Sequence, residues 1–258
     1  MPELPDVEGF RRYFSRFATG KQLRAVEALS ADMIRNSSAQ GLGRALRGRR
    51  FERPQRHGKW LLAPAGGPVV LMHFGMTGGL RWYRAGAAPH THDRVLFRFA
   101  DGTLAYRNMR KFGGVWLARD AAAVERVTGP LGPDAARVAP EELEDLMEPR
   151  RGGLKAALMD QRLLAGIGNE LSDEILWQAR IAPGRNVGDL GRAEVRGLHR
   201  ATRQVLRESM RRGRIPRHRD WLSSQRGVRN PRCPRCREGL RRETVAGRTA
   251  YWCSRCQS

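Results

Sequence analysis

The sequence predicts an α+β protein of more than one domain, and three observations lead to this prediction. Short alternating runs with β-branched and aromatic residues fill 45–118, and helical periodicity fills 140–212. All four cysteines lie in the arginine-rich tail 213–258. The chain of 258 residues is long enough for one large domain or two smaller ones. Because the pattern changes after Leu131-Gly132-Pro133, we place a domain boundary near residue 130.

The first predicted element is a helix over residues 1–17. Pro5 suits the first turn of a helix, and Asp6 and Glu8 place negative charge at its positive N-terminal end. Glycine and proline punctuate the β-rich region that follows, which favours a sandwich or a barrel. Its strand-like runs are LRWYR, DRVLFRF, GTLAYRN and GGVWLAR. Asp101-Gly102 separates two of these runs as the turn of a hairpin.

Helical segments dominate the second half of the chain. They are EELEDLM, KAALMDQRLL, ELSDEILWQA and AEVRGLHRATRQVLRESM. No stretch approaches 18 consecutive apolar residues, so the sequence predicts no transmembrane helix. The N-terminus has no basic flank followed by an apolar run, and we therefore expect a cytoplasmic protein without a secretory signal.

The charge balance is strongly basic. Lys and Arg number 48 against 26 Asp and Glu, which gives a formal net charge of +22 and an isoelectric point near 11.4. This balance predicts binding to a polyanion, most simply nucleic acid. The alternative is a solvated surface in a chain that prefers arginine, since the only lysines are Lys21, Lys59, Lys111 and Lys155. That preference does not explain the excess of basic over acidic residues.

The four cysteines form two C-x2-C pairs. Cys233 and Cys236 are separated from Cys253 and Cys256 by 16 residues, a spacing typical of a zinc site. The residues between the pairs alternate as a hairpin with its turn at Ala246-Gly247. Two disulfides are the alternative, and a reducing compartment favours zinc. Four cysteines leave no open position, so we predict one structural Zn²⁺ per chain.

The N-terminal residues allow two interpretations. Pro2 permits removal of the initiator Met, and the mature chain would then begin with a secondary amine. A free amine can attack a sugar C1′ and form a Schiff base, with Glu3 beside it as proton shuttle. The plainer interpretation of this segment is the start of a helix.

Six segments spread along the whole chain occur in a distinctive order. They are MPELPDVEG, HGKWLL, HFGMTG, MRKFGG, LMDQRLLAGIGNELSDEIL and the terminal cysteine module. Together they resemble the formamidopyrimidine-DNA glycosylase and endonuclease VIII family of base-excision repair enzymes. The PELPxVE form of the N-terminus resembles the formamidopyrimidine branch more closely.

The resemblance implies a fold of three domains. These are an N-terminal β-sandwich with an N-terminal helix over 1–130, a helix–two-turns–helix domain over 131–222, and a zinc finger over 223–258. It implies a monomeric bifunctional DNA glycosylase/AP lyase that excises oxidised or ring-opened bases. The implied partner is damaged double-stranded DNA in a basic cleft, with the damaged nucleotide flipped out of the stack.

The resemblance also implies which residues perform the chemistry. Pro2 is the nucleophile that displaces the base at C1′ and holds the sugar as an imine, and β-elimination, with δ-elimination after it, then cleaves the strand. Glu3 is the acid/base, and Lys59 contacts DNA beside the lesion. Taken alone, Lys59 is a surface lysine of a hairpin.

Further residues match DNA contacts of the family. Three fill the gap left by the flipped base, and three contact phosphate; they are Met76, Arg110 and Phe112 for the gap, and Lys111, Asn169 and Arg248 for phosphate. Without the resemblance, Met76 and Phe112 are interpreted as core residues and Asn169 as part of an ordinary helix–helix turn.

Two segments depart from the family pattern. Glu170-Leu171-Ser172 stands where Ile-Tyr-Ala is common, which brings a carboxylate near the DNA side. Residues 212–232 are rich in arginine, whereas members that excise 8-oxoguanine usually carry a Gly/Ser/Thr-rich loop there. We therefore predict weak action on 8-oxoguanine. A non-catalytic damaged-DNA-binding homologue and a zinc-ribbon RNA-binding protein are the alternatives, and the intact Pro2 and Glu3 argue against both.

Overall fold

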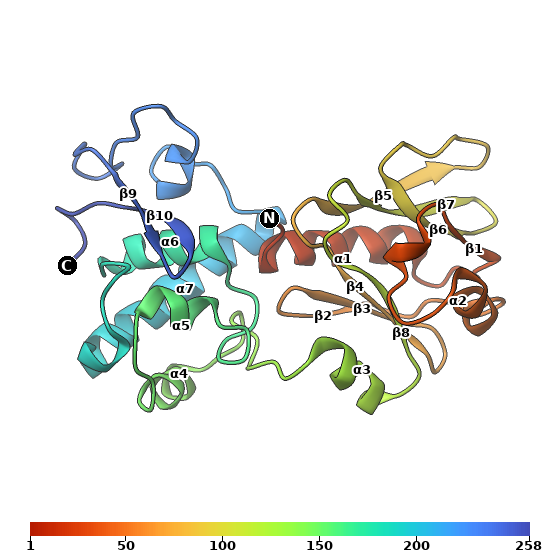
Figure 1. Ribbon diagram of the computed structural model, residues 1–258, viewed down its shortest axis with the longest axis horizontal. Helices are drawn as coiled ribbons and strands as arrows, with labels where there is room; N and C mark the ends of the chain where they lie inside the picture. The colour runs from red at the N-terminus through yellow and green to blue at the C-terminus, as the bar shows by residue number, and fades with distance from the viewer. The chain divides into compact units, whose positions relative to one another are not determined.

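The computed structural model describes residues 1–258, and the chain divides into two compact units (Figure 1). The first comprises Met1–Pro2 and Asp6–Pro130, and the second comprises Glu3–Pro5 and Leu131–Ser258. The three residues Glu3–Pro5 therefore group with a part of the chain that lies more than a hundred residues later.

Two four-stranded antiparallel sheets form the first unit and confirm the predicted β-sandwich (Figure 1). Their strand orders are β1-β6-β7-β5 and β2-β3-β4-β8. The strands are β1 (Ala25–Ala28), β2 (Gln55–His57), β3 (Trp60–Pro64), β4 (Val69–His73), β5 (Gly78–Arg84), β6 (Asp93–Arg98), β7 (Gly102–Asn108) and β8 (Gly114–Ala118). The predicted hairpin is present, but its turn is one residue earlier than predicted, at Ala100-Asp101, since Phe99 N–H donates to the carbonyl of Gly102 at 2.8 Å and Gly102 already belongs to β7.

Helix α1 (Leu4–Ala18) contributes one face to the core of the sandwich. Its buried residues Val7, Phe14 and Ala18 recur at helical spacing. The unit also contains α2 (Ala39–Leu46), α3 (Ala121–Thr128) and the 3₁₀ helix η1 (Ala31–Met33), which the sequence did not predict. Side-chain caps mark the starts of α2 and α3.

The second unit is helical, as predicted. It contains α4 (Pro140–Met147), α5 (Leu154–Met159), α6 (Asn169–Ala179), α7 (Arg192–Arg212) and the 3₁₀ helices η2 (Val187–Asp189) and η3 (Leu222–Gln225). The helical interpretation of KAALMDQRLL was wrong beyond Met159. Asp160 ends α5, because its carboxylate accepts the N–H of Arg162 and its carbonyl accepts those of Leu163 and Leu164.

The cysteine tail forms a hairpin that packs on α6. Strands β9 (Arg241–Val245) and β10 (Arg248–Trp252) pair in register around a turn at Ala246 and Gly247, whose φ angles are 51° and 69°. A separate small core holds this hairpin against the helices and contains Trp177, Leu222, Cys233, Tyr251 and Cys253. No helix of the chain is both long enough and apolar enough to cross a bilayer.

Candidate functional site

The Glu3 carboxylate is buried at the N-terminus of α6. Its Oε2 accepts the backbone N–H groups of Gly168 at 2.8 Å and Leu171 at 3.1 Å, and its Oε1 accepts that of Glu170 at 2.9 Å. Helices leave these first N–H groups without partners inside the helix, and the helix dipole favours a negative charge there. These three backbone N–H groups thus hold the Glu3 carboxylate in one orientation.

Two glycines allow this close approach. A Cβ at Gly168 would lie 2.4 Å from Cδ of Glu3, and a Cβ at Gly166 would lie 2.4 Å from Cδ1 of Leu4. Gly166 also has a φ of +114°, and its carbonyl accepts the N–H of Leu4 at 3.1 Å. The family resemblance places a phosphate contact at Asn169, directly after this turn, and the turn also contacts the start of the chain.

Pro2 directly precedes Glu3 and groups with the first unit. Lys59, also in that unit, occupies a two-residue turn with Gly58 between β2 and β3, which places it beside the paired residues His57 and Trp60. Gly58 has a φ of 53°, which suits this tight turn.

His73, at the end of β4, was not singled out from the sequence. Burial, followed by the positive charge of Lys59, lowers the pKa of His73 to about 4, so its imidazole is neutral near pH 7. Gly75 N–H donates to its Nδ1 at 3.3 Å, which leaves the proton on Nε2. The signal available in the sequence was the position of this histidine between an apolar strand and a glycine turn.

Met76 and Phe112 are exposed, so their interpretation as core residues was wrong. Their side chains are 38% and 51% accessible, and the loops that carry them adjoin at Gly75, where a Cβ would lie 1.6 Å from the Phe112 carbonyl. The Arg110 guanidinium lies 5.2 Å from the Phe112 ring centre, and the backbone N–H of Arg110 donates to Thr77 Oγ1 at 3.1 Å. The structure therefore brings the three predicted gap-filling residues to one surface.

Lys111 lies in the same loop with a φ of 56°. Its Nζ pairs with Asp32 at 3.3 Å, and its carbonyl accepts a hydrogen bond from Arg35.

Asn169 and Arg248 come together through the hairpin. Asn169 is the first residue of α6, and its Nδ2 donates to the carbonyl of Thr249 at 3.0 Å. Arg248 precedes Thr249 at the start of β10 and is exposed. The two predicted phosphate contacts thus lie on neighbouring parts of one surface.

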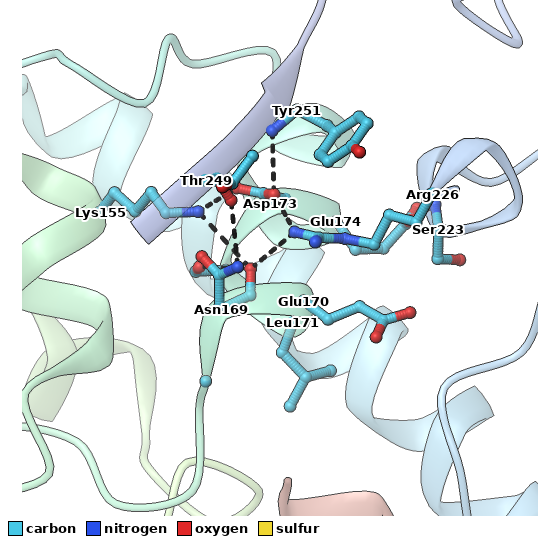
Figure 2. Close-up of polar contacts among 12 residues, drawn as sticks. Lys155, Asn169, Glu170, Leu171, Asp173, Glu174, Ser223, Arg226, Thr249 and Tyr251 are labelled. Carbon is cyan, nitrogen blue, oxygen red and sulfur yellow. Dashed lines mark hydrogen bonds and ion pairs between the residues drawn. The ribbon is translucent and has the colours of Figure 1, made fainter. Parts of the chain in front are cut away.

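A buried ion network lies beneath this surface (Figure 2). The Asp173 carboxylate pairs with Lys155 and with Arg226, which reach it from opposite sides, and accepts the N–H of Tyr251 at 3.0 Å. Burial raises the pKa of Asp173, and the two cations oppose that effect. Scarcity of lysine was the one sequence signal for Lys155.

Glu174, next to Asp173, faces the segment before the cysteines. Its Oε2 accepts the N–H of Ser223 at 2.8 Å, and its Oε1 accepts the side chain of Gln178 at 3.0 Å. Burial raises the pKa of Glu174 to about 7 against the effect of these hydrogen bonds. No sequence pattern singled out this carboxyl.

The four cysteines form a cluster that suits a metal ion. Their Sγ atoms all lie within 4.8 Å of one another, and none is in a disulfide. The Cys233–Cys256 and Cys236–Cys253 sulfur pairs are 3.8 and 3.5 Å apart. Tetrahedral thiolates at zinc–sulfur bonds of 2.3 Å have sulfurs separated by about 3.8 Å, so the donor set fits zinc.

A β-sandwich unit, a helical unit and a four-cysteine hairpin on a strongly basic chain define a modular protein with a metal-binding ribbon. Residues 1–115 match the formamidopyrimidine-DNA glycosylase N-terminal domain, and residues 131–218 match the helix–two-turns–helix (H2TH) domain of the same enzymes. The chain belongs to the formamidopyrimidine-DNA glycosylase family, which confirms the resemblance found in the sequence.

Individual relatives match over the full length. A formamidopyrimidine-DNA glycosylase of Geobacter metallireducens is 34% identical over 268 residues and covers all of both chains. One of Bacillus cereus is 31% identical over 274 residues, covering all of this chain and 99% of its own. The Lactococcus lactis enzyme bound to DNA containing an AP site superposes with a TM-score of 0.90 at 28% identity, covering 99% of each chain. Its complex with DNA containing N7-benzyl-Fapy-dG gives 0.89 at 28% identity, again over 99% of each.

Proposed function

We propose that this chain is a bifunctional DNA glycosylase and AP lyase of base-excision repair. The observation that carries the proposal is the Glu3 carboxylate, fixed by three backbone N–H groups directly after Pro2. A carboxylate held so firmly beside a chain-terminal amine suits repeated proton transfer better than it suits a purely structural role. The names of the relatives support the same activity.

The chemistry begins at the Pro2 nitrogen after removal of Met1. Its lone pair attacks C1′ of the damaged nucleotide, the glycosidic bond breaks, and the base leaves with its electron pair. Glu3 accepts the proton that the Pro2 nitrogen loses after attack and passes it to the ring oxygen as the C1′–O bond breaks, which leaves an iminium ion (a protonated Schiff base) between Pro2 and C1′. Glu3 then accepts a proton from C2′, and the 3′ phosphate leaves by β-elimination.

DNA binding in this proposal uses residues of both units. Lys59, Lys111, Asn169 and Arg248 contact phosphates, and neutral His73 is an additional donor through Nε2–H. Met76, Arg110 and Phe112 fill the space of the flipped base, since a thioether and an aromatic ring replace lost stacking and a guanidinium hydrogen-bonds the opposite base.

The cysteine cluster holds one structural Zn²⁺ in this proposal. The metal fixes the fold of the hairpin that presents Arg248 and takes no part in the reaction. The division of the second unit into a helical domain over 131–222 and a zinc finger over 223–258 belongs to the same proposal, as do a monomeric state and a cytoplasmic location.

Borohydride trapping on abasic DNA tests the proposal. Untagged protein with a free Pro2 is expected to form a covalent adduct with a duplex that contains one abasic site. A chain with a retained Met or an N-terminal tag is expected to lose both trapping and strand cleavage. Equal trapping by the blocked chain would show that Pro2 is not the nucleophile. DNA binding without trapping by the free chain would favour the non-catalytic alternative.

A further inference from the structure

Arg226 is an arginine of the arginine-rich segment whose guanidinium points into the protein. Its side chain is only 16% exposed. The guanidinium pairs with Asp173, donates to the carbonyl of Asn169 at 3.2 Å, and lies 5.0 Å from the centre of the Tyr251 ring (Figure 2). Both hydrogen bonds are donated by Nη2, so the guanidinium is directed at Asp173 and Asn169 in the interior.

The carboxylate that receives Arg226 joins three other parts of the second unit. Asp173 belongs to α6, its second cation Lys155 belongs to α5, and the Tyr251 N–H belongs to β10. Asp173 and Lys155 have side chains that are 1% and 0% exposed. Because buried charges are stable only when they are paired and hydrogen-bonded, this arrangement favours one fixed geometry.

The parts joined at Asp173 carry the two phosphate contacts of the proposed function. Asn169 begins α6 one turn before Asp173, and Arg248 begins β10 three residues before Tyr251. The hydrogen bond from Asn169 to Thr249 is the direct link between them, and the Arg226 contacts with Asp173 and Tyr251 lie immediately behind that link.

We propose that Arg226 is a positioning residue for binding of the DNA backbone. Through Asp173 it holds the start of α6 and the start of β10 in one arrangement, so that Asn169 and Arg248 meet phosphates together. Its own guanidinium does not touch DNA. The inference rests on the proposed function only in taking Asn169 and Arg248 as phosphate contacts.

Salt dependence separates this role from direct contact. Each phosphate neutralised by a side chain adds about 0.9 to the slope of log affinity against log salt for duplex DNA. Removal of a contacting arginine therefore lowers the slope by about one. Removal of a positioning residue leaves the contacting cations in the chain, and they still meet phosphate in the complex, so affinity falls by the cost of ordering them and the slope stays nearly unchanged.

The experiment measures binding of the zinc-loaded full chain to a duplex with a tetrahydrofuran abasic analogue by fluorescence anisotropy across a salt series. R226A is expected to bind about tenfold more weakly at every salt concentration with the wild-type slope. R248A is expected to lose about one unit of slope. R229A removes the same charge from an exposed position in the same segment and is the matched control. Any loss of affinity in R229A is expected to come with a smaller salt slope, as for a phosphate contact.

A second measurement distinguishes positioning from general damage. At saturating enzyme, the single-turnover trapping rate of R226A on abasic DNA is expected to fall much less than its affinity, because Arg226 contacts the carbonyl of Asn169 whereas Glu3 is held by the N–H groups of Gly168, Glu170 and Leu171. R226K keeps the charge but cannot reach Asp173 and Asn169 together, so its affinity is expected to be intermediate. If R226A loses zinc or its folded circular dichroism spectrum, R226K carries the test.

Two results would overturn the inference. A slope reduced by about one in R226A, as in R248A, would make Arg226 a phosphate contact, and unchanged affinity in R226A or R226K would remove the positioning role. Failure of the proposed function is separate from both. It would appear as wild-type protein that binds the duplex without trapping abasic DNA.

Discussion

Single side chains in this protein show how burial changes what a carboxyl does. Glu3 and Glu174 are both buried acids, but Glu3 lies at the start of α6 and accepts three of its backbone N–H groups, where a helix favours a negative charge. Glu174 lies inside α6, and its burial outweighs the hydrogen bonds from Ser223, Gln178 and Leu222 and raises its pKa to about 7.

The raised pKa of Glu174 predicts a measurable effect of pH on stability. In the unfolded chain this group ionises near its ordinary value of 4.5, whereas in the folded chain it holds its proton to about pH 7. The unfolded state thus binds fewer protons between these values, so this contribution to the free energy of unfolding falls as pH rises from 4.5 to 7. Each pKa unit corresponds to about 1.4 kcal/mol.

Glu174→Gln is expected to abolish that loss. Gln keeps an acceptor for Ser223 and has no proton to lose. The free energy of unfolding of the variant, relative to that of wild type, is therefore expected to rise by about 3 kcal/mol between pH 4.5 and 8. Urea unfolding at several pH values measures the difference, with the exposed Glu141→Gln as control. A constant difference between E174Q and wild type at every pH would contradict the titration.

At the scale of elements, the N-terminus of α6 is the part that positions Glu3. Gly168→Ala would place a Cβ where the Glu3 carboxyl lies, although the φ of −123° at this position is open to alanine. We expect the rate of abasic-site cleavage to fall by about a hundredfold or more, because small misplacements of a reacting group are costly. The free energy of unfolding should change much less.

Gly184→Ala is the matched control for this variant. A Cβ there meets no atom within 4 Å, so both the rate and the stability are expected to stay at wild-type values. Trapping by G168A at the wild-type rate would mean that Glu3 does not need its place on α6.

The cysteine hairpin is the second element with a direct test. Chelation or Cys233→Ser is expected to release one zinc per chain and to weaken DNA binding by tenfold or more, about 1.4 kcal/mol. The sandwich core shares no residue with the small core around Cys233, so β3, β4 and β7 should keep their protection from hydrogen exchange. Zinc analysis and exchange mass spectrometry measure both effects, and a zinc-free chain with full affinity would exclude the role.

Elements differed in how well the sequence predicted them. The hairpin of residues 241–252 was predicted because its cues, alternation and an Ala-Gly turn, are local. The end of α5 at Asp160 was missed, because apolar residues continue at helical spacing while a polar side chain captures the next N–H groups. The places of Glu3 on α6 and of Arg226 on Asp173 depend on contacts across 53 residues or more, and no local pattern encodes them.

At the scale of the whole molecule, the preference for one damaged base over another depends on the segment that precedes the cysteines. The segment before the cysteines is packed in place, with Pro216, Leu222 and Ser223 buried and Ser223 bonded to Glu174 and Pro216. Residues 212–220 contain one glycine and no Ser or Thr, so they lack the Gly/Ser/Thr-rich loop expected over 8-oxoguanine. Both observations indicate weak recognition of that base.

We therefore expect abasic-site cleavage and excision of ring-opened purines or oxidised pyrimidines to exceed 8-oxoguanine excision by about tenfold or more. That ratio corresponds to about 1.4 kcal/mol of transition-state discrimination. Single-turnover rates on matched duplexes measure it, with the abasic duplex as the reference for intact sugar chemistry. Removal of 8-oxoguanine as fast as formamidopyrimidine would contradict the prediction.

The attachment of Glu3–Pro5 to residues 166–171 has a consequence for biosynthesis. The start of the chain leaves the ribosome first, but its partners are made more than 160 residues later, at about 5–20 residues per second. The first residues therefore stay accessible for roughly ten seconds or more, the interval in which an aminopeptidase can remove Met1. In the proposed function, burial of Glu3 then follows removal of Met1, and the order of translation leaves the terminal amine accessible to that processing.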